Sequence, residues 1–294
     1  MSESVGTVAA LWRFPVKSFL GEKLAEADVT ERGIVGDRGH ALIDTSTGKV
    51  VSAKNPRLWP HLFTCRAEYV EEPRTGGKLP PVRITLGDGT IVLSDGADVD
   101  AALSKFFGRG VTLAQSAPAD FTIDQYHPDI EGADPQGRRD TVVDQKLGSA
   151  LFEQEGIPSP VQVGALFDVF PMSLLTTSTL DRFNELGPDT RFDQRRFRMN
   201  VIVATPEPGF VENGWVGRRV AIGDNAQVMV VMPDPRCVMP TLAQEDLPRD
   251  NEVMRTLVRH NRLDAGGTMS PCAGVYAAVT AAGTLHTGDE VKMA

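Results

Sequence analysis

The sequence is poor in cysteine and histidine, which narrows the chemistry open to it. Its 294 residues include three cysteines and five histidines. The cysteines, Cys65, Cys237 and Cys272, are too few and too scattered for a disulfide framework or for a zinc site built from CxxC pairs. The histidines form no metal-binding spacing with one another. A reducing compartment therefore fits this chain best.

Long hydrophobic runs and an excess of basic residues are also missing. No stretch approaches the roughly 20 apolar residues of a membrane-spanning helix, and the first residues lack the basic start and apolar run of a signal peptide. The formal net charge of -9 argues against a general nucleic-acid binder. These absences together predict a cytoplasmic protein that neither spans a membrane nor binds nucleic acid in general.

Familiar catalytic signatures are absent as well. The sequence contains no GxSxG, no Walker loop and no HExxH, and Gly36-Asp-Arg-Gly39 is too short for a dinucleotide fingerprint. The length allows two domains or one elaborate domain, and 41% hydrophobic residues can fill a sizeable core.

The hydrophobic pattern predicts a mainly β (α+β) protein with a few helices. Short alternating segments, punctuated by Gly and Pro, predict strands at 5–14, 24–30, 41–44, 49–52, 62–70, 82–86, 90–93, 161–170, 195–203, 219–222, 227–232, 273–280 and 289–292. Helical spacing and stop signals predict helices at 98–108, 173–186 and 250–261. A doubly wound sheet is not favoured, because strands and helices do not alternate. We expect a first domain at 1–115, a polar linker or surface excursion at 116–159, and a second domain at 160–294.

One cysteine stands in an unusual setting. Cys237 lies within Pro233–Pro240, where three prolines disfavour both helix and sheet. Arg236 precedes it and would favour the thiolate, the form that acts as a nucleophile or soft metal ligand. Most free cysteines are small buried hydrophobes, and that alternative stays open here. It is the preferred interpretation for Cys65, which shares a predicted strand face with apolar residues, and for Cys272.

Several basic residues stand in or next to predicted turns. They are Lys17, which precedes Ser18, and Arg38, Arg57 and Arg198. Each alone is more often a solvated charge or part of a local ion pair. Clustered around one pocket, they would bind a phosphorylated anion, because guanidinium groups are bidentate phosphate donors and lysine is a compact countercharge. A thiolate beside a phosphate cradle indicates a phosphorylated cofactor that carries a soft metal.

The order of motifs along the chain resembles a known family. The segments concerned are Phe14-Pro-Val-Lys-Ser18, Gly36-Asp-Arg38, Asn55-Pro-Arg-Leu58, Arg196-Phe-Arg-Met-Asn-Val-Ile-Val203, Trp215, Ile222-Gly223, Arg236-Cys237 and Gly274-Val-Tyr276. They resemble the MOSC proteins with an N-terminal β-barrel, the family of the mitochondrial amidoxime-reducing component and its bacterial relatives. The resemblance covers nearly the whole chain and implies an N-terminal β-barrel-like domain followed by a C-terminal MOSC β-barrel.

The resemblance also implies a cofactor and a set of residues that hold it. The cofactor is the molybdenum cofactor, a pterin dithiolene with a terminal phosphate (Mo-molybdopterin). By position, Cys237 resembles the thiolate that ligates molybdenum and carries the catalysis. The residues that would contact the rest of the cofactor by similarity are Lys17, Ser18, Arg38, Arg57, Thr176, Thr177, Ser178, Arg198, Asn200, Arg236 and Tyr276, with Arg57 the weakest candidate.

The implied activity is a reduction that needs an outside source of electrons. The family resemblance implies reduction of N-hydroxylated or N-oxide substrates, with electrons from a separate ferredoxin, flavodoxin or cytochrome b5-like reductase system. Two alternatives remain, a carrier that holds the cofactor without turnover and a sulfur relay with a persulfide on Cys237. The segment after Cys237 lacks the Asp-x-x-Thr-Gly of many relatives, so we expect a different substrate rim. We expect a surface role for His127.

Overall fold

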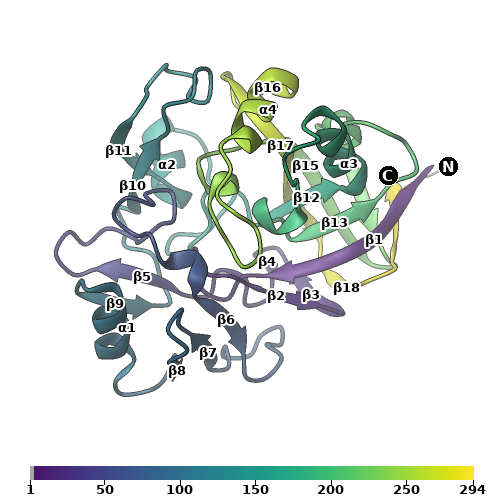
Figure 1. The fold of residues 1–294 in the computed structure, drawn as a ribbon. Helices are drawn as coiled ribbons and strands as arrows, with labels where there is room; N and C mark the ends of the chain where they lie inside the picture. Colours follow the sequence, from purple (N-terminus) through teal and green to yellow (C-terminus); the bar gives the residue numbers. More distant parts are fainter. Residues whose placement is uncertain (1–2) are drawn as a thin grey trace.

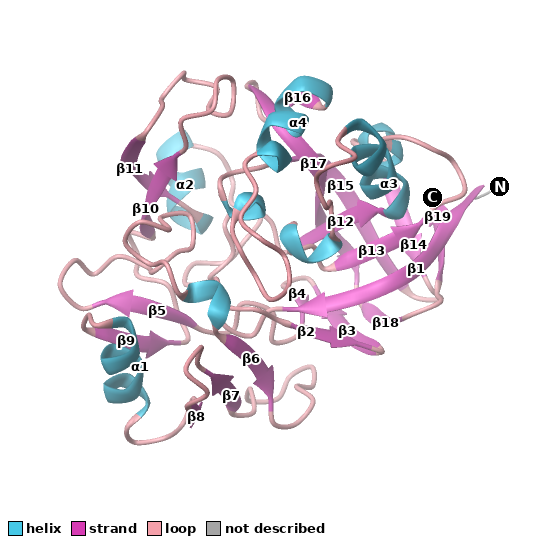
Figure 2. Ribbon diagram, viewed as in Figure 1, coloured by secondary structure: helices cyan, strands magenta, loops and turns pink. Residues whose placement is uncertain are grey.

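The structure is a computed structural model that describes residues 3–294, and β-strands dominate it (Figure 2). Strands and short sheets account for most of the regular structure, and the described residues contain four α-helices. The mainly β fold class predicted from the sequence is confirmed.

The largest sheet closes on itself as a seven-stranded barrel. The strands are, in spatial order, β12 (Met172–Thr176), β13 (Val201–Ala204), β1 (Glu3–Arg13), β19 (Glu290–Met293), β14 (Arg219–Ile222), β15 (Ala226–Pro235) and β17 (Met269–Ala281). The barrel closes because β17 pairs with β12, with Leu174 opposite Val275. Two short strands extend this sheet, β2 (Glu22–Leu24) beside β1 and β16 (Arg262–Asp264) beside β17.

The first strand of the chain is part of this barrel. Figure 1 shows β1 beside β13, and the register pairs Leu11 with Val201 and Thr7 with Glu290 on the other side. Val8 and Leu11 are both buried in the barrel core, because a register shift between Val8 and Ala10 interrupts the strict alternation of β1. The β-branched composition of the partner strands explains why these segments pair. The sheet therefore joins the two ends of the chain, and the domain boundaries remain a prediction.

Smaller sheets lie beside the barrel. One of them, β3 (Glu26–Thr30) with β4 (Gly33–Ile34) and β18 (Gly283–His286), packs on the barrel core through Val29, Ile34 and Leu285. A second core is surrounded by β5 (Ala41–Asp44) with β9 (Val111–Ala114); β6 (Arg66–Tyr69) with β7 (Val82–Thr85) and β8 (Ile91–Leu93); and α1 (Val99–Phe107). As predicted, α1 follows Asp98 and stops at Gly108, whose φ of 64° is the left-handed conformation that glycine tolerates. This core packs around Phe19, Leu42, Leu62 and Ile84.

The polar segment 116–159 carries regular structure that its composition does not indicate. It forms a hairpin of β10 (Thr122–His127) and β11 (Thr141–Lys146), followed by α2 (Gly148–Glu155). Phe121, Ile123 and Leu147 are buried in a separate small core. A few well-placed apolar residues suffice because the hairpin packs on the rest of the protein.

The structure corrects several boundaries near the predicted second domain. Residues 161–170, predicted as a strand, are irregular, and the strand β12 begins only at Met172. The helix predicted from Ser173 is α3 (Thr177–Leu186), because Thr176 caps it by accepting a hydrogen bond from the Thr179 amide. The strand predicted at 195–203 shortens to β13, and residues 49–52 form only an isolated bridge. The helix α4 (Glu252–His260) lies within its predicted range.

Candidate functional site

Two adjoining cavities lie where several barrel strands begin or end. Their volumes are about 70 and 90 Å³. They open between the loop after β1, the loop after β4, the loops before β12 and β13, and the loop after β15. The residues that line both are Arg38, Asp168, Ser173, Arg198, Met239 and Tyr276. The shared lining makes the two cavities one candidate site.

Most of the residues singled out from the sequence line this site. The first cavity brings together Lys17, Ser18, Arg38, Arg198, Asn200 and Tyr276. The second adds Arg236 and Cys237. These residues come from both ends of the chain, and the barrel strand β1 is what carries the Lys17 loop to the site.

Four residues named from the sequence do not line the two cavities. The Thr176 hydroxyl donates a hydrogen bond of 2.6 Å to buried Glu212, and the Ser178 hydroxyl contacts Thr205 at 2.6 Å. Thr177 begins α3 and lines neither cavity. Arg57 pairs with Asp140, and about half of its side chain is exposed. The first three positions build the start of α3 instead.

Three cavity residues adopt a strained backbone. Ser18, Arg38 and Arg198 have φ values of 65°, 48° and 56°, a region that side chains other than glycine rarely occupy. Only two other non-glycine residues within 3–294 share this feature, Asp140 and Glu245. Such strain persists where the surrounding structure fixes it and clusters at functional sites. This supports a functional reading of the cavity on grounds independent of charge.

The structure adds charged residues that sequence reasoning missed. Lys54 and Asp168 line the site, and Asp168 lies between Lys17 and Lys54, with its carboxylate 2.7 Å from the Lys54 ammonium. Asp234 pairs with Arg236 in the same cavity. Lys54 precedes the Asn55-Pro-Arg motif and was detectable as a further cation in a turn. Asp168 could not be identified as a site residue from the sequence, because it lies within a segment predicted as an apolar strand.

Burial and neighbouring charges set the protonation states in the site. Burial would raise the pKa of Asp168, but Lys17 and Lys54 outweigh it and hold that pKa far below its usual range. Burial lowers the pKa of Lys17 despite Asp168. Burial and the neighbouring Arg38 lower the pKa of Arg198 to about 9. The cations are therefore crowded and poorly hydrated, which favours an anionic ligand.

The cavity has a surplus of positive charge. Its basic side chains are Lys17, Arg38, Lys54, Arg196, Arg198 and Arg236, of which Arg196 donates to backbone carbonyl oxygens. Three carboxylates oppose them: Asp37 pairs with Arg38, Asp168 with both lysines, and Asp234 with Arg236. Arg198 donates instead to the Phe19 carbonyl oxygen at 2.6 Å and lies over the Phe14 ring at 4.2 Å. Its positive charge has no carboxylate partner among the ion pairs of residues 3–294.

Cys237 is the accessible thiol of the three. It is partly exposed, whereas Cys65 and Cys272 are buried as predicted. Burial raises the pKa of the Cys65 thiol to about 11 and that of Cys272 to about 12. The guanidinium of Arg236 bonds to Asp234 and to the Phe197 carbonyl oxygen, so its charge is already matched. Burial would lower the pKa of Lys54, but the negative charge of Asp168 and a charge on Cys237 raise it above its usual value.

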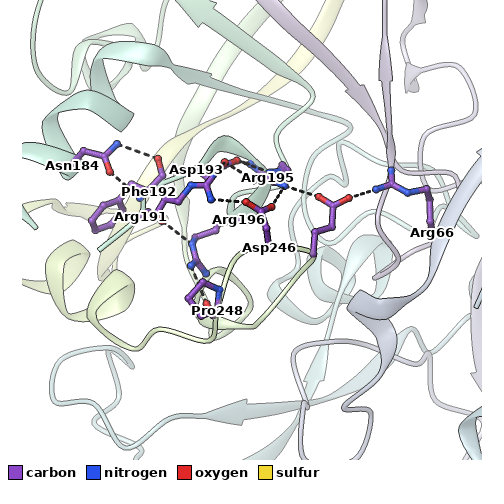
Figure 3. A network of polar contacts seen from close by, with 10 residues as sticks. Arg66, Asn184, Arg191, Phe192, Asp193, Arg195, Arg196, Asp246 and Pro248 are labelled. Atoms are coloured by element: carbon purple, nitrogen blue, oxygen red, sulfur yellow. Dashed lines mark hydrogen bonds and ion pairs between the residues drawn. The ribbon is translucent and has the colours of Figure 1, made fainter. Parts of the chain in front are cut away.

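A buried arginine holds the loop that follows Cys237. Arg196 is 1% exposed and donates to the carbonyl oxygens of Pro240, Leu242 and Pro248 at 3.1, 3.4 and 3.0 Å. Figure 3 shows Arg196 directed toward Pro248, beside a row of ion pairs in which Arg195 contacts Asp246. This network fixes the polypeptide on the C-terminal side of the thiol.

The family of the chain follows from comparison with known proteins. Residues 5–83 match the MOSC N-terminal beta barrel domain, and residues 163–292 match the MOSC domain. The barrel with its cavity at one end thus defines a MOSC domain protein. This chain belongs to that family and carries its N-terminal beta barrel domain, so the resemblance stated from the sequence is confirmed.

Curated relatives align over almost the whole chain. The mitochondrial amidoxime reducing component 2 of Homo sapiens is 25% identical over 307 residues, which cover 98% of this chain and 84% of the relative. The mitochondrial amidoxime-reducing component 1 of Mus musculus is 27% identical over 322 residues, covering 99% and 83%. Among solved structures, the YUAD protein from Bacillus subtilis aligns with 100% of this chain and 98% of its own at 14% identity and a TM-score of 0.46.

Two further predictions concern membranes and histidine. No helix within residues 3–294 is long and apolar enough to cross a membrane.

His127, expected at the surface, is instead buried, and its Nδ1 lies 3.3 Å from Asp134. The correction arises because the hairpin of β10 and β11 packs against the protein rather than projecting from it.

Proposed function

We propose that this protein is a molybdenum-cofactor-dependent oxidoreductase that reduces N-hydroxylated or N-oxide substrates with electrons from a separate donor protein. The observation that carries the proposal is the meeting of Cys237 with Lys17, Arg38 and Arg198 in one site. Membership of the MOSC family and the names of the curated relatives support it.

The residues present fit the chemical groups of that cofactor. A partly exposed thiol can supply a thiolate, which is a suitable ligand for a soft metal. In the same site, Lys17, Arg38 and Arg198 present ammonium and guanidinium groups that suit a terminal phosphate. Ser18, Asn200 and Tyr276 add hydrogen-bonding groups for a pterin.

The bound cofactor would supply two-electron and oxygen-atom chemistry, in which R-NHOH, two electrons and two protons give R-NH2 and water. The chain supplies binding and orientation. Arg196 and its carbonyl partners keep the Cys237 loop in place. Burial, opposed by Arg236, raises the pKa of Asp234 to about 6, so this cavity carboxyl can hold or release a proton near neutral pH.

The test is the metal content and turnover of a thiol variant. We expect purified protein to contain molybdenum and a pterin that fluoresces after oxidation, and to reduce N-hydroxy compounds with reduced methyl viologen. Cys237→Ala should lose both molybdenum and turnover, whereas Cys65→Ala, which removes a buried thiol outside the cavity, should keep them. Wild-type molybdenum and activity in Cys237→Ala would refute the proposal. Bound cofactor without turnover would indicate the carrier, and sulfane sulfur without molybdenum would indicate the sulfur relay.

A further inference from the structure

Asp168 occupies the part of the site where an anion would bind. Its carboxylate pairs with the Lys17 ammonium and lies 2.7 Å from that of Lys54. The side chains of Lys17 and Lys54 are 7% and 12% exposed, while that of Asp168 is 24% exposed. Two almost fully buried cations therefore share one carboxylate that still reaches solvent.

The carboxylate of Asp37, which pairs with the cavity residue Arg38, is anchored to the backbone and to a neighbouring side chain. Asp37 is fully buried and accepts hydrogen bonds of 2.8 Å from the Phe14 amide and from the Asn200 side chain, in addition to its pairing with Arg38. The contacts of the Asp168 carboxylate are the two lysines. The Asp37 carboxylate is thus fixed by neutral groups of the protein as well as by Arg38. The Asp168 carboxylate is held by the two lysine ammonium groups, which are also the groups that would attract an anionic ligand.

The segment that carries Asp168 is held by single hydrogen bonds, such as those from the Gly148 amide to the Asp168 carbonyl oxygen at 2.7 Å and from the Lys17 ammonium to the Leu166 carbonyl oxygen at 3.0 Å, and not by a strand or a helix. Residues 157–171 contain neither, and they connect α2 to β12. Phe167, Asp168 and Phe170 all line the first cavity. Its volume of about 70 Å³ is well below the roughly 300–1,000 Å³ of ordinary ligand pockets. A cofactor-sized ligand therefore needs part of the lining to move, and Phe167, Asp168 and Phe170 belong to that lining.

We propose that Asp168 is an internal counter-ion, which neutralises Lys17 and Lys54 while the site is empty and leaves them when a phosphate-bearing ligand binds. The identity of that ligand rests on the function proposed above, but the exchange itself does not. A phosphate dianion brings more charge and more acceptor oxygens to the two lysines than a carboxylate does, and a displaced Asp168 regains water. Asp168 would lower the affinity of the site for the anion. When no anion is bound, Asp168 would keep the two buried cations paired.

The direct test uses inorganic phosphate and full-length protein produced in cells that cannot make the pterin. Asp168→Asn removes the competing charge, so phosphate should bind about tenfold more tightly than to the wild type in calorimetric titration. The matched control is Asp134→Asn, which removes a carboxylate that is also paired with two basic groups, Arg138 and His127, but lies outside the site. Its phosphate affinity should equal that of the wild type. An unchanged affinity in Asp168→Asn would overturn the proposal.

A second measurement needs only the wild-type chain. Withdrawal of Asp168 should accelerate amide hydrogen exchange in residues 165–170 when phosphate is added, because the Asp168 segment loses its contacts with the lysines. Slower or unchanged exchange there with phosphate bound would mean that Asp168 stays in place, and would also overturn the proposal. Neither measurement involves molybdenum. If protein from cells that make the cofactor contains no molybdenum, while the pterin-free protein shows both phosphate effects, the proposed function fails and this inference stands. Molybdenum in protein from those cells, with no phosphate effect in the pterin-free protein, would have the reverse meaning.

Discussion

Arg38 donates a hydrogen bond of 3.3 Å from Nη2 to the carbonyl oxygen of Arg198, across 160 residues of sequence. Both guanidinium groups lie over the ring of Phe14, at 4.6 and 4.2 Å from its centroid. Both residues also have positive φ values. Two like charges, carried by residues with strained backbones, thus lie over one aromatic ring. This arrangement becomes favourable when an anion shares the site.

Arg198→Lys should weaken retention of the cofactor by about tenfold, because lysine keeps the charge but loses the planar stacking on Phe14 and the bond to the Phe19 carbonyl. The measurement is the rate at which molybdenum leaves the protein during dialysis. Arg57→Lys is the matched control, since Arg57 lies over Tyr126 at the same 4.2 Å and pairs with a carboxylate, but outside the cavity. Equal loss of metal in both variants would contradict the cavity as the cofactor site.

Gly274→Ala should destabilise the barrel by more than about 3 kcal/mol, from backbone strain and steric clash together. Gly274 has a φ of 77°, and a Cβ there would lie 2.6 Å from the Leu174 carbonyl oxygen, at the pairing of β17 with β12 that closes the barrel. Chemical denaturation with urea gives the free energy of unfolding.

Gly217→Ala is the control for the backbone conformation alone. Gly217 has a φ of 80° and open space around the position of a Cβ. Its substitution should cost about 1–2 kcal/mol, the strain of a left-handed alanine. Equal losses of unfolding free energy in Gly274→Ala and Gly217→Ala would show that the clash with the Leu174 carbonyl oxygen of β12 contributes nothing.

His40 should make the protein less stable in mild acid. Burial lowers its pKa from 6.5 to about 4. The unfolded chain then binds a proton that the folded chain does not, so stability contributed by the neutral ring is complete above about pH 6.5 and is lost as pH falls toward 4. A shift of this size corresponds to at most about 3 kcal/mol.

The difference between wild type and His40→Asn isolates this effect from the other titrating groups. Between pH 7 and pH 4 the wild type should lose more unfolding free energy than the variant, as followed by urea denaturation at each pH. His260→Asn removes an exposed histidine at the end of α4 and should leave the wild-type pH dependence in place. Parallel curves for the wild type and His40→Asn would contradict the prediction.

Residues 160–294 expressed alone should fail to form the native barrel. The strand β1 lies between β13 and β19, so its removal leaves two unpaired edges and opens the core around Val8 and Leu11. Circular dichroism and size-exclusion chromatography of the fragment, compared with the whole chain, measure this. A folded, monomeric fragment would support the predicted boundary at residue 160 as that of an independent unit.

Local patterns were most informative where one face of a strand or helix is buried. The strands predicted at 41–44 and 219–222 coincide with β5 and β14, because turns flank both segments and, in β14, apolar residues alternate along the strand. The segment 161–170 was misjudged because its apolar residues cover a cavity and small clusters, and do not pair in a sheet. The polar segment 116–159 was misjudged for the opposite reason, since a few buried side chains hold its hairpin and helix in place.

The sequence by itself determined the β-rich character and the presence of cations in turns, because proline, glycine and period-two alternation act on neighbouring residues. The loop that presents Cys237 is shorter than its prolines predicted, because β15 continues through Pro233 and Pro235 beside β17. Only the tertiary structure decided that Lys17, Arg38, Arg198 and Cys237 share one site. The pairing of β1 with β13 and β19 brings the Lys17 loop to the same rim as the loops from the second half of the chain. The tertiary structure likewise placed Asp168 between two lysines, because a charge pair between distant segments leaves no periodic trace in the sequence.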